Sequence, residues 1–223
     1  MKKSLVAVVG LIVLGGCGSG ASSGAPPSAS ASTPNSTTSA VTTSSPTASA
    51  SPSASAPTTS QTAVPAEKSP PGDIPDNVAY VPYTNAVGRY SFTHPEGWAE
   101  TTARTTVSYT DKLNGVKVFP GTDTSPATVA TANRRDVPAL THTEPAFELR
   151  SVSAVTVPGG RGVRIVYRRN SAPDPVTGRQ YRDEVERYEL VSVGREVIAE
   201  FFGPVGADNV DAYRTMVQSL RIT

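Results

Sequence analysis

Residue types that catalysis needs are scarce in this sequence. A nucleophilic triad requires a general base, and the only histidines, His94 and His142, lie far apart along the chain. No serine after residue 72 stands in a Gly-x-Ser-x-Gly motif, which is typical of one large class of hydrolases. His94 precedes Pro95 at the end of an expected strand and is interpreted as a turn-capping side chain, and His142 as a solvated loop residue. The sequence therefore predicts no catalytic residue and a protein that is not an enzyme, with an envelope enzyme as the weakest alternative.

The sequence also contains no motif typical of a metal or cofactor site. Zinc sites use clusters of Cys and His, whereas Cys17 is the only cysteine of the chain. Asp208-Asn-Val-Asp211 lacks the ligand spacing of a calcium loop and is interpreted as a helix cap. Gly159 to Gly162 lacks the strand, loop and helix of a phosphate-binding motif, so a hairpin turn is expected there. We expect no metal and no cofactor.

One set of charged residues is a candidate recognition surface. In one expected strand, alternation places Arg164 and Arg168 on the same face. The next strand places Arg182, Glu184 and Glu186 on one face in the same way. If the two strands pair, arginines and glutamates oppose each other across the ladder. Two interpretations stay open: a solvated charged face of the sheet, which we favour, and a surface that recognises a partner.

The single tryptophan, Trp98, follows an expected strand in which Tyr90 and Phe92 share one face. A tryptophan in this position is usually part of the core, which is the interpretation we favour. The alternative is an aromatic side chain that stacks on a ligand. Tyr80 and Tyr83 lie in a proline-punctuated run and are expected to pack the end of the preceding segment onto the domain.

The N-terminus has the layout of a secretory signal peptide, predicted to span residues 1–16. Lys2 and Lys3 precede an apolar run of about ten residues, and small residues then lead to Cys17. The run is too short for a membrane-spanning helix, which needs about 20 residues. Leu14-Gly-Gly-Cys17 resembles the lipobox of bacterial lipoproteins, and this resemblance implies diacylglycerol, with palmitate among its acyl chains, on Cys17. The alternative is an ordinary signal peptide followed by a chance cysteine.

Residues 17–71 are interpreted as the lipidated cysteine and a disordered tether. The stretch is rich in Ser, Thr, Ala and Pro and has no charged residue before Glu67. Such a composition cannot bury enough apolar surface to offset about 1–2 kcal/mol of backbone entropy per residue. As a flexible coil the tether would reach about 40 Å, and Ser and Thr beside Pro also favour O-glycosylation. We favour a spacer through the cell wall over a merely tolerated low-complexity tail.

Residues 72–223 have the length of one ordinary domain. They carry 17 basic and 18 acidic residues once Lys2, Lys3, Lys68 and Glu67 are left out of the 20 and 19 of the whole chain, so their net charge is −1. Such a balance argues against nucleic acid as a partner and against electrostatic attraction to a membrane. With the only cysteine acylated, no disulfide is expected and the core alone must stabilise the domain.

Alternating apolar residues and turn signals predict an α+β domain, an antiparallel sheet with packed helices. Asn114-Gly115 is expected to turn one hairpin and Pro158-Gly159-Gly160 another. Thr124 or Ser125 is expected to cap the first helix, and Asp208 the last. The strands are expected at 88–94, 106–110, 116–119, 147–157, 162–169, 180–193 and 196–202, and the helices at 124–136 and 209–220.

Several segments of this domain resemble one superfamily. Tyr90 to Trp98 (Tyr-Ser-Phe-Thr-His-Pro-Glu-Gly-Trp) resembles the first strand and turn of the PsbP-like superfamily, which also includes the Ran-binding Mog proteins. Tyr213 to Arg221 resembles its closing helix, and residues 172–214 resemble lipoproteins of this fold from actinobacteria. The resemblance covers residues 80–223 and implies an antiparallel sheet with packed helices and a non-enzymatic binding or assembly role. It transfers no catalytic residue.

These features together predict a lipid-anchored, non-catalytic binding or assembly module at the cell envelope. Two acyl chains on Cys17 would bind a bilayer durably, so the expected location is the extracytoplasmic face of the cell membrane. The partner is expected to be an envelope protein or, in the rival hypothesis, an apolar or lipidic ligand carried between sheet and helices. The domain is expected to be a monomer.

Overall fold

A computed structural model describes residues 61–68 and 72–223. The expected signal peptide, Cys17 and most of the tether lie outside the described residues, so what the sequence predicts for them stays a prediction. The domain boundary predicted at residue 72 also stays a prediction. Within the described ranges, no helix is both long and apolar enough to cross a membrane.

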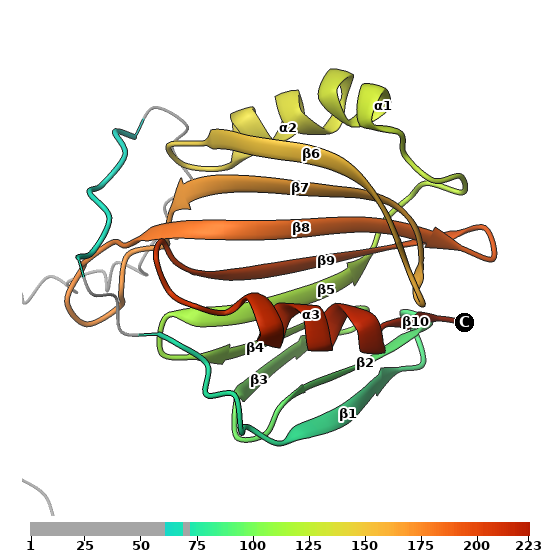
Figure 1. Cartoon of the computed structure of the whole chain (residues 1–223), viewed down its shortest axis with the longest axis horizontal. Coiled ribbons are helices and arrows are strands. Elements are labelled where there is room, and N and C mark those ends of the chain that lie inside the picture. The colour runs from blue at the N-terminus through green and yellow to red at the C-terminus, as the bar shows by residue number, and fades with distance from the viewer. Residues whose placement is uncertain (1–60, 69–71) are drawn as a thin grey trace, which may run out of the picture. The chain divides into compact units, whose positions relative to one another are not determined.

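The strands of the described residues form two antiparallel sheets (Figure 1). They are β1 (Tyr80–Asn85), β2 (Tyr90–Pro95), β3 (Ala99–Ala103), β4 (Thr106–Asp111), β5 (Asn114–Pro120), β6 (Glu148–Val157), β7 (Gly160–Asn170), β8 (Arg182–Ser192), β9 (Arg195–Pro204) and β10 (Arg221–Ile222). The larger sheet has the order β3-β4-β5-β9-β8-β7-β6, and the smaller has the order β1-β2-β10. Neighbouring strands are antiparallel throughout. With the helices packed on the larger sheet, this confirms the predicted fold class.

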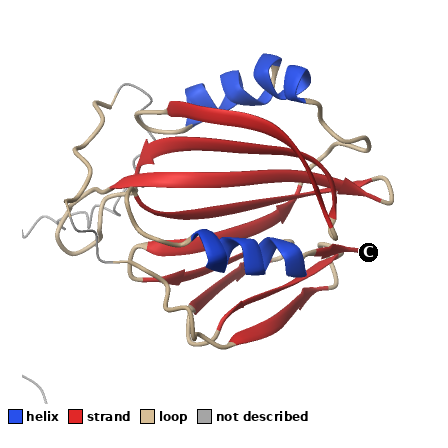
Figure 2. Cartoon of the chain, in the orientation of Figure 1, coloured by secondary structure: helices blue, strands red, loops and turns tan. Residues whose placement is uncertain are grey.

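Helices cover different parts of the two faces of the seven-stranded sheet (Figure 2). They are α1 (Val129–Arg134), α2 (Asp136–Thr143) and α3 (Val210–Ser219). Because side chains alternate along a strand, β8 sends Tyr188 and Leu190 to one face and Val185 to the other. The face with Tyr188 and Leu190 packs on α3 and on the smaller sheet, and the face with Val185 packs on α1 and α2.

Most of the strands lie where alternation predicts them. Tyr90 and Phe92 are both buried on one face of β2, as expected. The β6–β7 hairpin turns at Pro158-Gly159, also as expected. The sequence did not predict β1 and β3. Pro82 lies inside β1, which is tolerated because β1 is an edge strand and a missing N–H there interrupts no ladder.

The β4–β5 hairpin was predicted with the wrong turn residues. It turns at Lys112 and Leu113, and Lys112 has a φ of 52°. Asn114 and Gly115 belong to β5 instead. Gly115 is required there for space, because a Cβ at this position would lie 2.1 Å from the Phe202 ring. Asn114-Gly115, a pair that favours turns, therefore lies within a strand and contributes to packing inside the sheet.

Asn114 has a second role, which the turn prediction missed. Its side chain is buried, donates to the carbonyl oxygen of Gly72, and accepts from the Asn209 amide at 2.9 Å. Asn209 in turn accepts from the backbone N–H of Ile74 at 2.9 Å. The two asparagines thus fix residues 72–74, so that Ile74 enters the core beside α3.

The helical region after β5 also differs from the prediction. The helix expected at 124–136 begins only at Val129, because the Thr128 hydroxyl caps it by accepting from the Thr131 N–H at 3.1 Å. A second helix, α2, then occupies the segment around Pro138. Pro138 lies in the first turn of α2, where a helix needs no N–H donor from the residue, so the proline does not prevent the helix.

Candidate functional site

Four of the five charged residues of the candidate recognition surface pair with one another. Strands β7 and β8 are neighbours, as the sequence analysis required. Arg164 Nε donates to Glu186 Oε2 at 3.0 Å, and Arg168 Nε donates to Glu184 Oε2 at the same distance. The Tyr188 hydroxyl also donates to Glu186, at 2.9 Å. These arginines therefore have carboxylate partners within the sheet, and a role for them in recognition stays a prediction.

The side chain of Arg182 is less exposed than those of the other four residues of the candidate recognition surface. Its side chain is only 5% exposed, and it donates to Ala146 O at 2.7 Å and to Glu148 Oε2 at 2.9 Å. These contacts tie the start of β8 to the segment that leads into β6. A partner cannot reach the guanidinium in this arrangement, because the exposure of Arg182 depends on these contacts at the start of β8 and not on strand alternation.

The two histidines lie on separate elements. His94 is buried on β2, where its ring stacks on Tyr109 with 3.5 Å between ring centroids, and its Nδ1 is 2.9 Å from Pro95 O. His142 is exposed near the end of α2. Among residues 61–68 and 72–223, no three His, Cys, Asp or Glu side chains are grouped so that they could hold a metal ion.

Trp98 is half-buried and not a fully enclosed core residue. It packs against the core on one side and lines a cavity of about 280 Å³ on the other. Ile74, Pro75 and Val78 provide apolar walls of this cavity, and Lys112 lies at its rim on the β4–β5 turn. Both interpretations of the tryptophan therefore have a structural basis.

Replacing Trp98 by Ala should lower the free energy of unfolding by about 1–3 kcal/mol, less than the about 3–5 kcal/mol of a fully buried aromatic side chain. Only part of the indole leaves water on folding, so only part of the burial energy is lost. Urea unfolding followed by far-ultraviolet circular dichroism measures the change, and Trp98→Phe serves as the conservative control. A loss well above 3 kcal/mol would assign Trp98 entirely to the core.

A second cavity, the α2 cleft, lies between α2 and the sheet face beneath it. It measures about 290 Å³, and β5, β8, β9 and α2 all contribute to it. Its floor contains the Phe119 ring, with Lys117 Nζ and the Arg187 guanidinium 5.2 and 5.8 Å from the ring centroid. The lining residues are Lys117, Phe119, Asp136, Ala139, Leu140, Thr143, Glu144, Arg187, Glu189 and Glu200.

Opposite charges follow one another across the strands under the α2 cleft. In the register of the sheet, Lys117 lies opposite Glu200, and Glu200 lies opposite Arg187. Arg187 donates to Glu200 at 2.5 Å and to Glu189 Oε1 at 2.7 Å. All three of these paired side chains are largely buried, with side-chain exposures of 15% for Arg187, 8% for Glu200 and 3% for Glu189. The cleft is therefore built on a buried ionic network.

Glu189 is the unusual member of this network. Its second carboxylate oxygen, Oε2, is buried and has no hydrogen-bond partner in the part of the chain that the structure describes. Burial raises the pKa of Glu189, although Arg187 acts in the opposite direction. The other carboxylates of the cleft have cationic partners: Asp136 contacts Arg135, and Glu144 contacts Arg169. One buried acceptor in the α2 cleft is thus left free.

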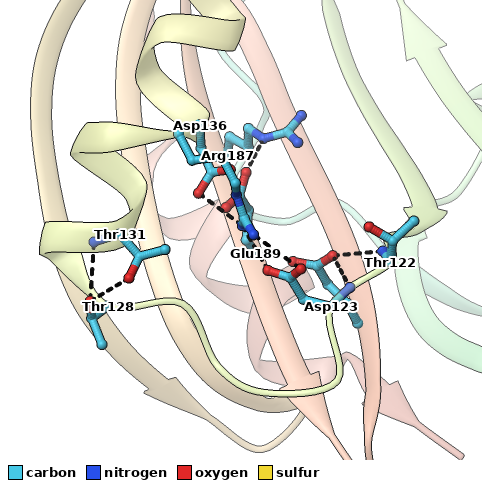
Figure 3. Close-up of polar contacts among 9 residues, drawn as sticks. Thr122, Asp123, Thr128, Thr131, Asp136, Arg187 and Glu189 are labelled. Atoms are coloured by element: carbon cyan, nitrogen blue, oxygen red, sulfur yellow. Dashed lines mark hydrogen bonds and ion pairs between the residues drawn. The ribbon is translucent and has the colours of Figure 1, made fainter.

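The loop before α1 is fixed beside this network (Figure 3). Glu196 Oε2 on β9 accepts from the backbone N–H groups of Thr122 and Asp123, at 2.9 and 3.1 Å. The Asp123 carboxylate in turn accepts two hydrogen bonds from Arg135, which also contacts Asp136 at the start of α2. This chain of contacts links the N-terminal end of α2 to β9.

None of the residues that line the α2 cleft is a predicted site residue. A signal was present, because charges stand on both faces of the expected strand at 180–193, including Arg187 and Glu189 on the face opposite Glu186. A strand buried on one face would not place an arginine and a glutamate there without partners. Arg187 and Glu189 pair with each other, and Arg187 also pairs with Glu200 of β9, a strand that the sequence could not place beside them.

Asp183 is a further buried carboxylate, at the start of β8. Its side chain lies 3.9 Å from Arg169 Nε. Burial raises its pKa to about 7, although Arg169 and Arg182 oppose the shift. The unfolded chain releases the proton near pH 3.9, so between pH 4 and 7 only the folded state binds it.

The free energy of unfolding should therefore contain a contribution from Asp183 that is complete below about pH 4 and lost by about pH 7, up to about 4 kcal/mol. Asp183→Asn should flatten this part of the profile. Urea unfolding at several pH values measures it, and Asp211→Asn, an exposed position, is the control. Identical profiles for Asp183→Asn and the wild type would contradict the prediction.

The fold defines an α+β protein with two antiparallel sheets and an open cleft under α2. Its sequence matches no protein-family model and no curated protein. Among solved structures, it is similar to the Ran-binding protein Mog1p of Saccharomyces cerevisiae, with 11% identity, 66% of this chain and 96% of that chain covered, and a TM-score of 0.42. For cyanobacterial PsbP of Synechocystis sp. PCC 6803 the identity is 15%, the coverage 68% and 98%, and the TM-score 0.45. For LpqN of Mycobacterium tuberculosis, described as involved in cell envelope biogenesis, these values are 14%, 70% and 82%, and 0.33.

Proposed function

We propose that this chain is a lipid-anchored, non-catalytic binding module of the cell envelope, and that its α2 cleft receives a cationic hydrogen-bond donor of a partner protein. The observation that carries the proposal is Glu189, which lines the cleft and whose buried Oε2 atom has no hydrogen-bond partner among the described residues. An unsatisfied buried polar atom costs about 1–3 kcal/mol, and a donor from a ligand would remove this cost. A lysine or arginine side chain has the charge and the donors for this site.

The surroundings of Glu189 support a polar occupant. A cation beside Glu189 would stabilise the ionised carboxylate, which burial disfavours. Phe119 offers the flat ring on which the aliphatic or guanidinium part of such a side chain can lie. Ala139 and Thr143 line the cleft from α2 and are exposed, so a partner can approach from this side.

Blocking the α2 cleft tests the proposal. Ala139→Arg would fill the cleft from α2 without removing any member of the ionic network. Thr141→Arg is the matched control, because Thr141 is exposed on the same helix and does not line the cleft. We expect Ala139→Arg to reduce in-cell crosslinking to the partner at least tenfold, and Thr141→Arg to leave it unchanged.

A well-folded Ala139→Arg protein that captures its partner at the wild-type level would remove the cleft from the proposal. A second variant, Arg164→Glu with Arg168→Glu, examines the charged face of β7 and β8 in the same assay. Loss of capture in this variant alone would place the recognition surface there. Circular dichroism and the melting temperature confirm the fold of each variant.

The lipid anchor is proposed from Cys17, which lies outside the described residues. Cys17→Ser should abolish labelling by an alkyne analogue of palmitate and should release the protein or leave its precursor uncleaved, because no thioether can form. Membrane fractionation measures the change, and Ser19→Ala is the control. Unchanged labelling and membrane retention of Cys17→Ser would contradict the anchor.

The cavity beside Trp98 favours a second candidate function, the carriage of a small apolar ligand. Ile74, Pro75 and Val78 provide its apolar walls. The charged residues Asp73, Glu96, Asp111 and Lys112 line it as well. Trp98 is the only tryptophan, so its fluorescence would report on an occupant directly. Native mass spectrometry of the purified protein tests this candidate: a retained small molecule supports it, and an empty protein with unshifted fluorescence contradicts it.

A further inference from the structure

Residues 61–68, which the sequence assigns to the tether, contact the end of the seven-stranded sheet. Asn170, the last residue of β7, is 1% exposed and holds them by their main chain. Its Oδ1 accepts from the Val64 N–H at 3.0 Å, and its Nδ2 donates to Thr62 O at 2.8 Å. One side-chain amide thus satisfies both a donor and an acceptor of the segment.

This geometry is that of a β-ladder made by a side chain. In an extended segment, the C=O of one residue and the N–H of the second residue after it point to the same side. An amide group, with one acceptor and one NH₂ donor, matches this pair. The interaction therefore depends on an extended main chain and not on the side chains of Thr62 and Val64.

The orientation of the Asn170 amide is fixed by its neighbours. Arg182 Nη1 donates to Asn170 Oδ1 at 3.4 Å, which identifies this atom as the acceptor and leaves Nδ2 to face Thr62 O. The Asn170 backbone N–H donates to Pro145 O at 2.9 Å. The buried Arg182 thus has a role that alternation alone did not indicate: it helps to orient Asn170 and links it to Ala146 and Glu148.

Side-chain contacts extend the site along the segment. Gln180 Nε2 donates to Gln61 Oε1 at 3.2 Å, and Arg179 pairs with Glu67. The Arg179 guanidinium lies 4.9 Å from the centroid of the Tyr181 ring. This exposed ion pair contributes little stability by itself. It does place the Arg179 cation beside Glu67, an acidic residue that follows the main chain held by Asn170.

We propose that Asn170, Arg179 and Gln180, the Asn170 clamp, form a binding site for an extended peptide with a carboxylate after the clamped residues, and that residues 61–68 are its occupant within the same chain. Residues 61–68 then belong to the domain and not to the tether.

Hydrogen exchange in the full-length mature protein tests the occupancy. The Val64 amide should exchange at least tenfold more slowly than the Ala63 amide, and Asn170→Ala should remove this difference. The Ile74 amide, which Asn209 holds, is the internal control and should stay protected. Exchange of Val64 at the free-chain rate in the wild type, or unchanged protection in a folded Asn170→Ala protein, overturns the proposal.

A second variant keeps the test decisive if Asn170→Ala does not fold. Val64→Pro removes the donor from the occupant segment and leaves Asn170, Arg179 and Gln180 unchanged. In this full-length variant, a peptide with the sequence of residues 61–68, acetylated and amidated, should saturably shift the Asn170 side-chain amide signal. The same peptide N-methylated at its valine should not. Equal shifts with both peptides, or none with either, overturn the clamp.

Discussion

Arg187→Met should lower the free energy of unfolding at pH 7 by about 3–5 kcal/mol, the largest effect that we expect from a single charged residue. Arg187 holds the carboxylates of Glu189 and Glu200 together under α2. Without it, both buried carboxylates lose the cation to which they are hydrogen-bonded. Methionine is unbranched and replaces the aliphatic part of the arginine side chain, so most of the loss measures charge and not a cavity.

Two results would identify the cause as electrostatic. The loss should shrink as the pH falls, because burial raises the pKa of Glu189 and its protonation removes an unpaired charge. The variant Arg187→Met/Glu189→Gln/Glu200→Gln, in which no charge remains, should recover most of the stability, since neutral replacements of buried ion pairs are often tolerated. Urea unfolding at pH 5 and pH 7 measures both. A loss below about 1 kcal/mol for Arg187→Met at pH 7 would show that water reaches the network.

Phe201→Ala should also cost about 3–5 kcal/mol. Phe201 lies on β9, is 1% exposed, and contacts Tyr213 of α3 and Tyr188 of β8 with ring centroids 5.3 and 5.7 Å away. Its removal opens a cavity at the point where the sheet and α3 meet, and both aromatic contacts are lost. We expect a melting temperature lowered by several degrees and a smaller free energy of unfolding in urea.

Phe202→Ala is the matched control for this prediction. Phe202 is the next residue along β9, points to the opposite face and is only half-buried, over Gly115. It should cost clearly less than Phe201→Ala. Equal losses at the two positions would mean that the packing between α3 and the sheet does not dominate the stability of the domain.

The fold class could be predicted because each strand carries its own local signal. The alternation that buries Tyr90 and Phe92, and the turn at Pro158-Gly159, depend on residues close together in the sequence. The β4–β5 turn was misplaced because the turn preference of Asn114 is small against its buried hydrogen bonds to Gly72 and Asn209. Those partners are far away in the sequence, and no local pattern contains them.

The candidate site residues could likewise be predicted only where their contacts depend on a local sequence pattern. Cross-strand pairing of Arg164 and Arg168 with Glu186 and Glu184 was predicted, because it needs only two adjacent strands and a period of two. The α2 cleft was not, since its floor joins β5, β8 and β9. Residues 61–68 were grouped with the tether on composition, and the contacts of Asn170 with them depend on one amide at the end of a distant strand.

By itself the sequence determined the class of the domain, its strand faces and the prediction of an anchor at Cys17, since local periodicity and a short motif suffice for these. Only the tertiary structure decided which charges are buried. Arg182 and Arg187 look like surface arginines in the sequence, yet both are largely enclosed. The free energy of burying a charge depends on the partners that the fold supplies, and Glu148, Glu189 and Glu200 reach these arginines only when the sheet is assembled.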